Sequence, residues 1–396
     1  MTGNIFEVVR DITYIGVDDH AIDLFENQYK VPEGVSYNSY LIKGEKTAVV
    51  DTTDDQTGTE WLANLQKALD GRKPDYLIIE HLEPDHSSLI STFVEIYPDA
   101  TLVMSATAAR MLPNYFDPIP SDCKIMTVKE GDTLDLGGLT LHFYLAPMVH
   151  WPEVMMAYCP ERKLLFSADA FGTFGALDSL TDDWAEEARR YYFNIVGKYG
   201  AQVQNALKKL STLEIETICP LHGPMITENI SHYISLYDTW SSYRPEKEGV
   251  FIAAASIHGN TLEAAEYLAE RLRQLGAGDV FVADLTRYDL SAAVAEAFKY
   301  PMAVFCASSY DAGLFTPMHT FLHLLSIKGY CNREAAIIEN GSWAPSAAKS
   351  MRAMLESMKG IEILPDTVTI RGAFKEADRP TIDALANTII SQLSKN

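Results

Sequence analysis

The second part of this 396-residue sequence alternates short, continuously apolar runs with amphipathic stretches, and few architectures accommodate that rhythm. A run that is apolar along its whole length predicts a strand buried on both faces, as in a parallel sheet covered by helices. The pattern therefore predicts a doubly wound α/β domain over residues 249–396. The expected strands lie at 249–256, 279–285, 302–309, 333–340 and 361–365, with helices between them.

The first part has a different rhythm, in which short β-rich runs are separated by Gly, Asp and Pro turn signals. Segment 184–210 reads as one long or interrupted helix, and the polar segment 243–249, with Pro and Gly, reads as a linker. We therefore expect two domains, 1–248 and 249–396, and at roughly 100–200 residues per domain the total length suggests two domains or more. The strands expected in the first domain lie at 36–42, 47–52, 76–80, 139–146, 163–169 and 216–220.

Composition excludes several classes of partner. The net charge is −22, from 54 acidic against 32 basic residues, which disfavours binding to nucleic acid phosphates or to anionic lipid. No apolar run approaches the ~20 residues that span a bilayer, and the N-terminus has no secretory pattern. The five cysteines are scattered and never form C-x-x-C, so a disulfide scaffold and a Cys-ligated metal module are not expected. We expect a cytoplasmic protein without nucleic acid or membrane partners.

The strongest chemical signal is the string His81-Leu-Glu83-Pro-Asp85-His86, which directly follows an apolar strand. It holds four potential metal ligands in six positions, and its proline argues against a regular helix, so we expect a loop. Uncompensated charges so close together would be costly, which favours a metal site. Isolated histidines such as His142 and His232 are more simply structural.

Three further ligand-type residues occupy the same local context, because His150, Asp169 and His222 each follow the end of a predicted strand. Seven ligands are too many for one four-coordinate ion, so two metals are expected, with Asp169 as the natural bridge. Mixed histidine and carboxylate ligands suit zinc, iron or manganese.

A second candidate site opens the C-terminal domain. Residues Ser256-Ile257-His258-Gly259-Asn260-Thr261 join the first strand to a helix, and hydroxyls, glycine and a helix N-terminus together favour a phosphate. A simple helix cap at Asn260 or Thr261 is the alternative. In a sheet of order 2-1-3-4-5, the loops after the third and fourth strands meet this loop. Their small and aromatic residues suit a flat ring system: Ser308, Ser309, Tyr310, Asp311, Ala312 and Gly313, then Asn340, Gly341, Ser342 and Trp343.

The pattern H-x-[HE]-x-D-H, followed by separate His, Asp and His, resembles the metallo-β-lactamase fold. Its hydrolases usually have histidine where this chain has Glu83, and a harder, more anionic site favours iron. The strings HLEPDH, APMVHWP, SADAFGTFGALD, CPLHGP and PEGVSYNSYLI closely resemble the flavodiiron proteins. This resemblance implies one iron on His81, Glu83 and His150, a second on Asp85, His86 and His222, and Asp169 between them.

The C-terminal domain resembles flavodoxin, which implies FMN, although His258 replaces a residue that usually carries a hydroxyl. The implied fold is an N-terminal metallo-β-lactamase-like αββα sandwich followed by a flavodoxin-like doubly wound parallel sheet. The implied enzyme is an oxidoreductase that reduces O2 to water and/or NO to N2O, with no catalytic residues beyond the metal ligands. The resemblance also implies a head-to-tail homodimer or a dimer of dimers.

The missing C-x-x-C pairs predict an external electron donor, with rubredoxin as the first choice and a reduced deazaflavin coenzyme as the second. Two alternatives stay open at this point. One is a dinuclear zinc hydrolase with a flavodoxin-like appendage, and the other is a gas sensor without turnover.

Overall fold

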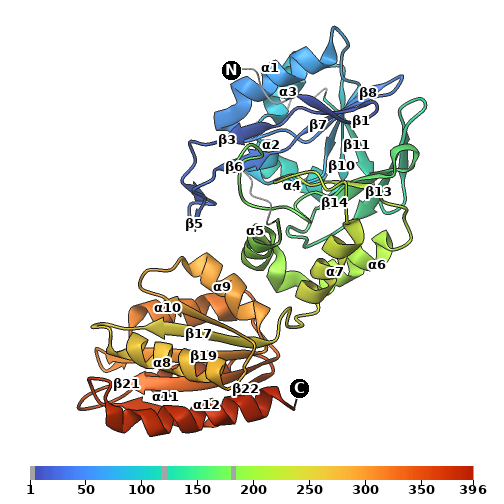
Figure 1. Cartoon of the computed structure of the whole chain (residues 1–396). Coiled ribbons are helices and arrows are strands. Elements are labelled where there is room, and N and C mark those ends of the chain that lie inside the picture. The colour runs from blue at the N-terminus through green and yellow to red at the C-terminus, as the bar shows by residue number, and fades with distance from the viewer. Residues whose placement is uncertain (1–4, 117–122, 180–183, 396) are drawn as a thin grey trace. The chain divides into compact units, whose positions relative to one another are not determined.

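The computed structural model describes residues 5–116, 123–179 and 184–395, and divides the chain into two compact units, Met1–Asp238 and Thr239–Asn396 (Figure 1). The division falls inside helix α7 (Ile230–Ser241), and the first strand of the second unit begins at Gly249. The domain boundary at 248 stays a prediction. No helix among the described residues is long and apolar enough to cross a membrane.

Within the described residues, the first unit is built on two sheets. The larger one runs in the order β1 (Phe6–Val9), β2 (Ile12–Tyr14), β7 (Tyr40–Lys43), β8 (Thr47–Val50), β9 (Tyr76–Ile79), β10 (Thr101–Ser105) and β11 (Lys124–Val128). The smaller one runs in the order β12 (Thr133–Asp135), β13 (Thr140–Leu145), β14 (Met155–Cys159), β15 (Leu164–Phe166) and β16 (Thr217–Cys219). Two short antiparallel pairs accompany them: β3 (Val17–Asp19) with β6 (Val35–Tyr37), and β4 (Leu24–Phe25) with β5 (Tyr29–Lys30).

The two sheets face each other across one apolar core, in which Tyr40 and Val50 of the larger sheet join Phe143 and Phe166 of the smaller one. The other face of the larger sheet packs on helices α1 (Gly58–Leu69), α3 (Ile90–Ile96) and α4 (Ala106–Met111). Helices α5 (Trp184–Tyr191) and α6 (Gly200–Leu210) lie in the crossover between the parallel strands β15 and β16. These layers form the expected αββα sandwich.

The expected helix over 184–210 is interrupted. Between α5 and α6, residues Tyr192–Val196 form a π-helical turn and Gly197–Tyr199 a 3₁₀ turn. Tyr191, Tyr192 and Phe193 are all buried, and the π turn lets these consecutive rings face the interior together.

The second unit contains a parallel sheet in the order β18 (Asp279–Asp284), β17 (Gly249–Ala255), β19 (Met302–Tyr310), β21 (Arg333–Asn340) and β22 (Ile361–Ile370). This is the 2-1-3-4-5 order of a flavodoxin-like fold. Helices α8 (Asn260–Gln274) and α12 (Arg379–Leu393) share one core with one face of the sheet, while α9 (Leu290–Lys299), α10 (Thr316–Ile327) and α11 (Ala347–Glu356) complete the unit (Figure 1).

Strand β22 is longer than expected. It continues through Pro365, because β22 lies at the edge of the sheet and a missing amide donor is tolerated there. The pairing of β21 with β22 shifts its register between Ala335 and Ile337, next to this proline. Strand β20 (Gly313–Leu314) pairs back on β19 as a short hairpin.

Candidate metal and flavin sites

The ends of four strands bring the predicted metal ligands together. His81 follows β9, His150 follows β13, Asp169 follows β15 and His222 follows β16. The backbone ties these ends to one another: Leu221 donates to the carbonyl of Ala168, and Met155 donates to the carbonyl of Glu80 across the two sheets. Strands that are distant in the sequence therefore deliver their ligands to one place.

The expected loop at 81–86 is partly wrong. Residues Pro84–Ser87 form a single helical turn, α2, with Pro84 at its first position, where a missing amide donor has no cost. The turn separates Glu83 from Asp85 and His86, so these side chains enter two different groups of ligands.

The first group contains His81, Glu83, His150 and Asp169, whose potential ligand atoms all lie within 4.8 Å of one another. The Nε2 of His150 is 3.0 Å from Glu83 Oε2 and 2.9 Å from Asp169 Oδ2. The Nε2 of His81 lies 3.2 Å from the same Glu83 oxygen. Four side chains thus converge on one point.

The second group contains Asp85, His86 and His222, again within 4.8 Å. The Nε2 atoms of His86 and His222 are 3.0 Å apart, and they lie 3.4 Å and 3.2 Å from Asp85 Oδ2. Two imidazole nitrogens at this separation share at most one proton, so at least one lone pair points into the centre of the group.

Asp169 faces both groups with different oxygens. Its Oδ2 lies beside His150, and its Oδ1 lies 3.3 Å from the Nε2 of His86. The side chain is almost completely buried, and Oδ1 has no hydrogen-bond partner among the described residues. A carboxylate that presents one oxygen to each of two ligand groups has the form of a metal bridge.

The charges of His150 and Asp169 depend on their neighbours in the two groups. Burial alone would lower the pKa of His150, but its contacts with Asp169 and Glu83 raise this pKa to about 9. Burial opposes ionisation of Asp169, but the surrounding histidines hold its pKa well below the usual value. Three carboxylates and four imidazoles fit two divalent cations, which would replace these protons.

Three buried carboxylates behind the ligands were missed by sequence reasoning. Glu153 contacts His81, Glu80 accepts hydrogen bonds from the amides of Ala157 and Ala168, and Asp51 accepts one from the amide of Glu80. Burial raises the pKa values of Asp51 and Glu80 well above their usual range. Only the position of Glu153, three residues after His150, offered a signal, and an isolated Glu is too common to single out.

Aromatic rings surround the ligand histidines. The rings of Phe25, Tyr37 and Tyr191 lie 5.2, 5.7 and 5.7 Å from the ring of His222. Trp151 stands edge-on to His81 at 5.2 Å. These rings restrict the access of water to the two groups, which strengthens the electrostatic interactions inside.

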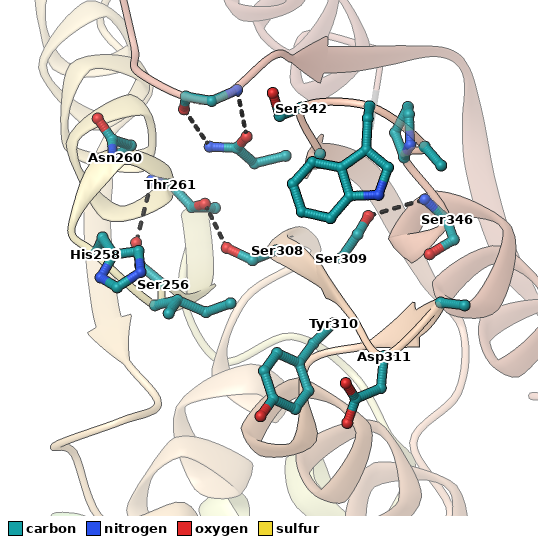
Figure 2. A pocket seen from close by; sticks show the side chains of 18 of the residues that line it. Ser256, His258, Asn260, Thr261, Ser308, Ser309, Tyr310, Asp311, Ser342 and Ser346 are labelled. Atoms are coloured by element: carbon teal, nitrogen blue, oxygen red, sulfur yellow. Dashed lines mark hydrogen bonds between the residues drawn. The ribbon is translucent and has the colours of Figure 1, made fainter.

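The candidate flavin site is a cavity of about 840 Å³ in the second unit, at the carboxyl ends of β17, β19, β21 and β22 (Figure 2). Of the predicted residues, those that line it are Ser256, Ile257, His258, Asn260, Thr261, Ser308, Ser309, Tyr310, Asp311, Ala312, Asn340, Gly341, Ser342 and Trp343. Sequence reasoning missed Ala344, Pro345, Ser346, Gly372 and Ala373, which also line it. The last two follow β22, whose loop was not considered.

Two predicted glycines lie beside the cavity lining. Gly259 is the N-cap of α8 with a φ of 88°, so the expected alternative of a side-chain cap at Asn260 or Thr261 is wrong. Gly313 belongs to the β20 hairpin. Their roles in flavin binding stay predictions.

Hydroxyl groups of the residues that line the cavity form hydrogen bonds with one another and with backbone amides. Ser256 Oγ accepts a hydrogen bond from the amide of Thr261, and the hydroxyls of Thr261 and Ser308 are 3.0 Å apart (Figure 2). Ser309 Oγ accepts from the amides of Ser346 and Ala347, which ties the β19 loop to the start of α11. The first loop, at the N-terminus of α8, presents the hydroxyl and amide groups that a phosphate requires.

The aromatic side chains at the rim of the cavity are unusually exposed. Trp343 is 91% exposed and Tyr310 is 47% exposed. Large exposed rings beside a cavity are available for stacking on a planar ligand. The hydroxyl and amide groups of the first loop, the volume of the cavity and these rings together fit FMN.

The comparisons with known proteins concern the chain as a whole. Residues 35–223 match the model of the ODP family beta lactamases. The chain is 30% identical to an uncharacterized protein from Methanocaldococcus jannaschii, over 94% of each chain. It is 27% identical to the anaerobic nitric oxide reductase flavorubredoxin of Salmonella arizonae, over 96% of this chain and 79% of that protein.

The structure of rubredoxin oxygen:oxidoreductase from Desulfovibrio gigas matches 99% of both chains, with a TM-score of 0.92 and 25% identity. The chain spans about half the length of the diflavin flavoproteins of Synechocystis that it also matches. With a nearly full-length relative, the matching family model and the shared two-unit fold, the chain belongs to the flavodiiron protein family.

Proposed function

We propose that this protein reduces O2 to water and/or NO to N2O at a diiron centre, with electrons relayed by FMN from an external donor. The observation that supports this most is the placement of Asp169 between two groups of histidines and carboxylates. Relatives named as a nitric oxide reductase and an oxygen oxidoreductase support the choice of substrates.

In this proposal His81, Glu83, His150 and Asp169 hold one iron, and Asp85, His86, His222 and Asp169 hold the other. Bound iron and bound FMN together supply the electrons, four for each O2 or two for each pair of NO molecules. The protein's residues position these groups, keep water out and admit a small gas.

Iron is favoured over zinc by the ligand chemistry. The first group contains two carboxylates, Glu83 and Asp169, and no described cysteine belongs to either group. Carboxylate-rich sites suit iron that changes oxidation state, whereas zinc has no redox chemistry. The dinuclear zinc hydrolase is therefore not favoured.

The electron donor is proposed to be a separate rubredoxin, with a reduced deazaflavin coenzyme as second choice. The described cysteines form no disulfide with one another, and most of them are buried. We further propose that the protein acts in the cytoplasm as a head-to-tail homodimer or a dimer of such dimers, in which the flavin of one chain serves the irons of the other.

The test begins with the purified protein, which should contain two irons and one FMN per chain. After anaerobic reduction, O2 or NO is added in separate experiments, and O2 consumption and N2O formation are measured under identical conditions. Turnover with an added reductant confirms the reductase and excludes a pure gas sensor. A colourless zinc protein, or a reduced protein that consumes neither gas, would overturn the proposal.

A further inference from the structure

Among the described residues, His81 is the only one of the four candidate ligand histidines that hydrogen-bonds to a carboxylate outside the two groups. Glu153 Oε1 accepts hydrogen bonds from His81 Nδ1, at 2.8 Å, and from the amide of Leu82, at 3.0 Å. The side chains of His81 and Glu153 are both completely buried. The backbone of Glu153 is held in turn, because Ser105 Oγ donates to its carbonyl at 2.7 Å.

The corresponding Nδ1 atoms of the second group have no charged hydrogen-bond partner among the described residues. His222 Nδ1 contacts the neutral backbone carbonyl of Ser36 at 2.8 Å. His86 Nδ1 is buried and has no hydrogen-bond partner within the described part of the chain. The two ligand groups therefore differ in the charge that stands behind their histidines.

This difference has a direct chemical consequence. A carboxylate on Nδ1 keeps the proton there, so the lone pair of Nε2 points toward Glu83 and Asp169. An anionic partner also makes the imidazole a stronger donor to a metal than a neutral carbonyl does. Glu153 adds one negative charge behind the first group, and no described carboxylate hydrogen-bonds to the Nδ1 atoms of the second group.

We propose that Glu153 is a positioning residue that makes the two halves of the metal centre unequal. Iron held by His81, Glu83 and His150 would bind more tightly and would be more strongly stabilised in its ferric state, while iron held by Asp85, His86 and His222 would be released more readily. This inference rests on the proposed diiron function and assigns a distinct role to each half of the centre.

The other two buried carboxylates do not share this role. Glu80 is occupied by the amides of Ala157 and Ala168, and Asp51 Oδ1 accepts from backbone amides alone. Neither makes a hydrogen bond with an imidazole of the two groups within the described residues. Among the described residues, a hydrogen bond between a candidate ligand imidazole and a carboxylate outside the two groups is therefore particular to Glu153.

The test uses Glu153→Gln, because glutamine keeps the acceptor oxygen and the size but removes the charge. The exposed Glu161, which accepts a hydrogen bond from the amide of Thr140, supplies the matched control Glu161→Gln. Each metal-free protein is titrated anaerobically with Fe²⁺, and each iron-loaded protein is challenged with a chelator. FMN content and the thermal unfolding curve report whether the variants fold.

The wild-type protein and Glu161→Gln should bind and release iron in two separate steps. Glu153→Gln should weaken the tighter step by about 10–100-fold, the usual effect of losing such a partner, and bring the two steps together. In the partly oxidised protein, Mössbauer spectra should show one distinct ferric site in the wild type and lose that distinction in the variant.

Two iron-binding steps that do not change in a folded Glu153→Gln protein would overturn the inference and leave the reductase proposal intact. A wild-type protein that binds no iron would instead overturn the proposed function. If Glu153→Gln does not fold, Glu153→Asp provides the second test. Aspartate keeps the negative charge, so the two iron-binding steps should stay separate. Two steps that merge in Glu153→Asp contradict the inference.

Discussion

Asp169 shows how much of the site depends on one side chain. Its two oxygens face different ligand groups, and four histidines lie within 4.0 Å of it. The carboxylate is almost completely buried. Its loss therefore affects both halves of the proposed centre at once, whereas the loss of Glu83 or Asp85 affects one half.

We expect Asp169→Asn to reduce bound iron from two per chain to less than one, because an amide is a poor bridge between two cations. FMN content should not change, since the flavin cavity lies in the other unit. Metal analysis and the flavin absorbance measure both effects. Asp178→Asn, at an exposed position paired with His20, is the control and should keep both irons.

Cys159 provides a prediction about pH. Burial and the neighbouring Glu161 carboxylate raise the pKa of this thiol to about 11. A thiol in an unfolded chain ionises near pH ~8.5, so the folded protein keeps its proton over a range in which the unfolded chain has lost it. The free energy of unfolding should therefore fall as the pH rises from about 8.5 to about 11.

Alkylation followed by mass spectrometry checks the same thiol. At pH 8 the folded protein should leave Cys159 unmodified, while the partly exposed Cys123 should react. In Cys159→Ala the free energy of unfolding should fall less between pH about 8.5 and about 11. Rapid alkylation of Cys159 in folded protein at pH 8 contradicts the assignment.

At the scale of elements, the strand ends place the ligands and tight turns fix them. Gly223 follows His222 with a φ of 76°, and an added Cβ would lie 2.2 Å from Thr173 Oγ1. Its amide donates to Ser36 Oγ, while the Ser36 carbonyl contacts His222. The turn after β16 therefore has room for glycine alone.

We expect Gly223→Ala to displace His222 and to release the iron of the second group. Gly71→Ala is a matched control, because Gly71 also has a positive φ, 82°, but nothing lies within 4 Å of the added Cβ. Both variants carry the backbone cost of about 1 kcal/mol for a side chain in this conformation. Only Gly223→Ala should also lose metal, as measured by iron content; equal iron in both variants contradicts the prediction.

For the whole molecule, metal and flavin belong to different compact units, so their removal should affect different unfolding transitions. Free iron at a concentration about 100 times its dissociation constant should raise the free energy of unfolding of the first unit by about 2.7 kcal/mol. At ~2–4 °C per kcal/mol, its melting temperature should rise by several degrees. In calorimetry, added iron should shift the unfolding transition of the first unit and leave the transition of the flavin-binding unit in place.

The proposed head-to-tail dimer predicts complementation between two inactive variants. Asn260→Asp places a negative charge in the loop 256–261, which is predicted to bind the phosphate of FMN. An acidic residue also suits the first turn of α8, so the chain should fold without FMN. Mixed dimers of Asp169→Asn and Asn260→Asp should regain gas reduction, because an intact flavin then faces an intact metal centre. No recovery in verified mixed dimers would show that each chain uses its own flavin.

The sequence alone predicted the seven candidate ligands because the chemistry of each one is visible in its type and its place after a strand. The regular alternation after residue 249 likewise predicted the flavodoxin-like unit. The turn α2 was expected as a loop, since a proline at the first position of a helix looks the same in sequence as a proline that prevents one. Glu153 was missed because its contact with His81 joins residues that are 72 positions apart.

By itself, then, the sequence determined the fold class, the seven candidate ligands and most of the flavin cavity, because hydrophobic periodicity and residue chemistry are local properties. Only the tertiary structure decided how those ligands divide into two groups, which oxygen of Asp169 faces each group, and which histidine has a charged partner. Those features depend on the separation of side chains from different strands and sheets, and distances across a folded core are not encoded in the spacing along a chain.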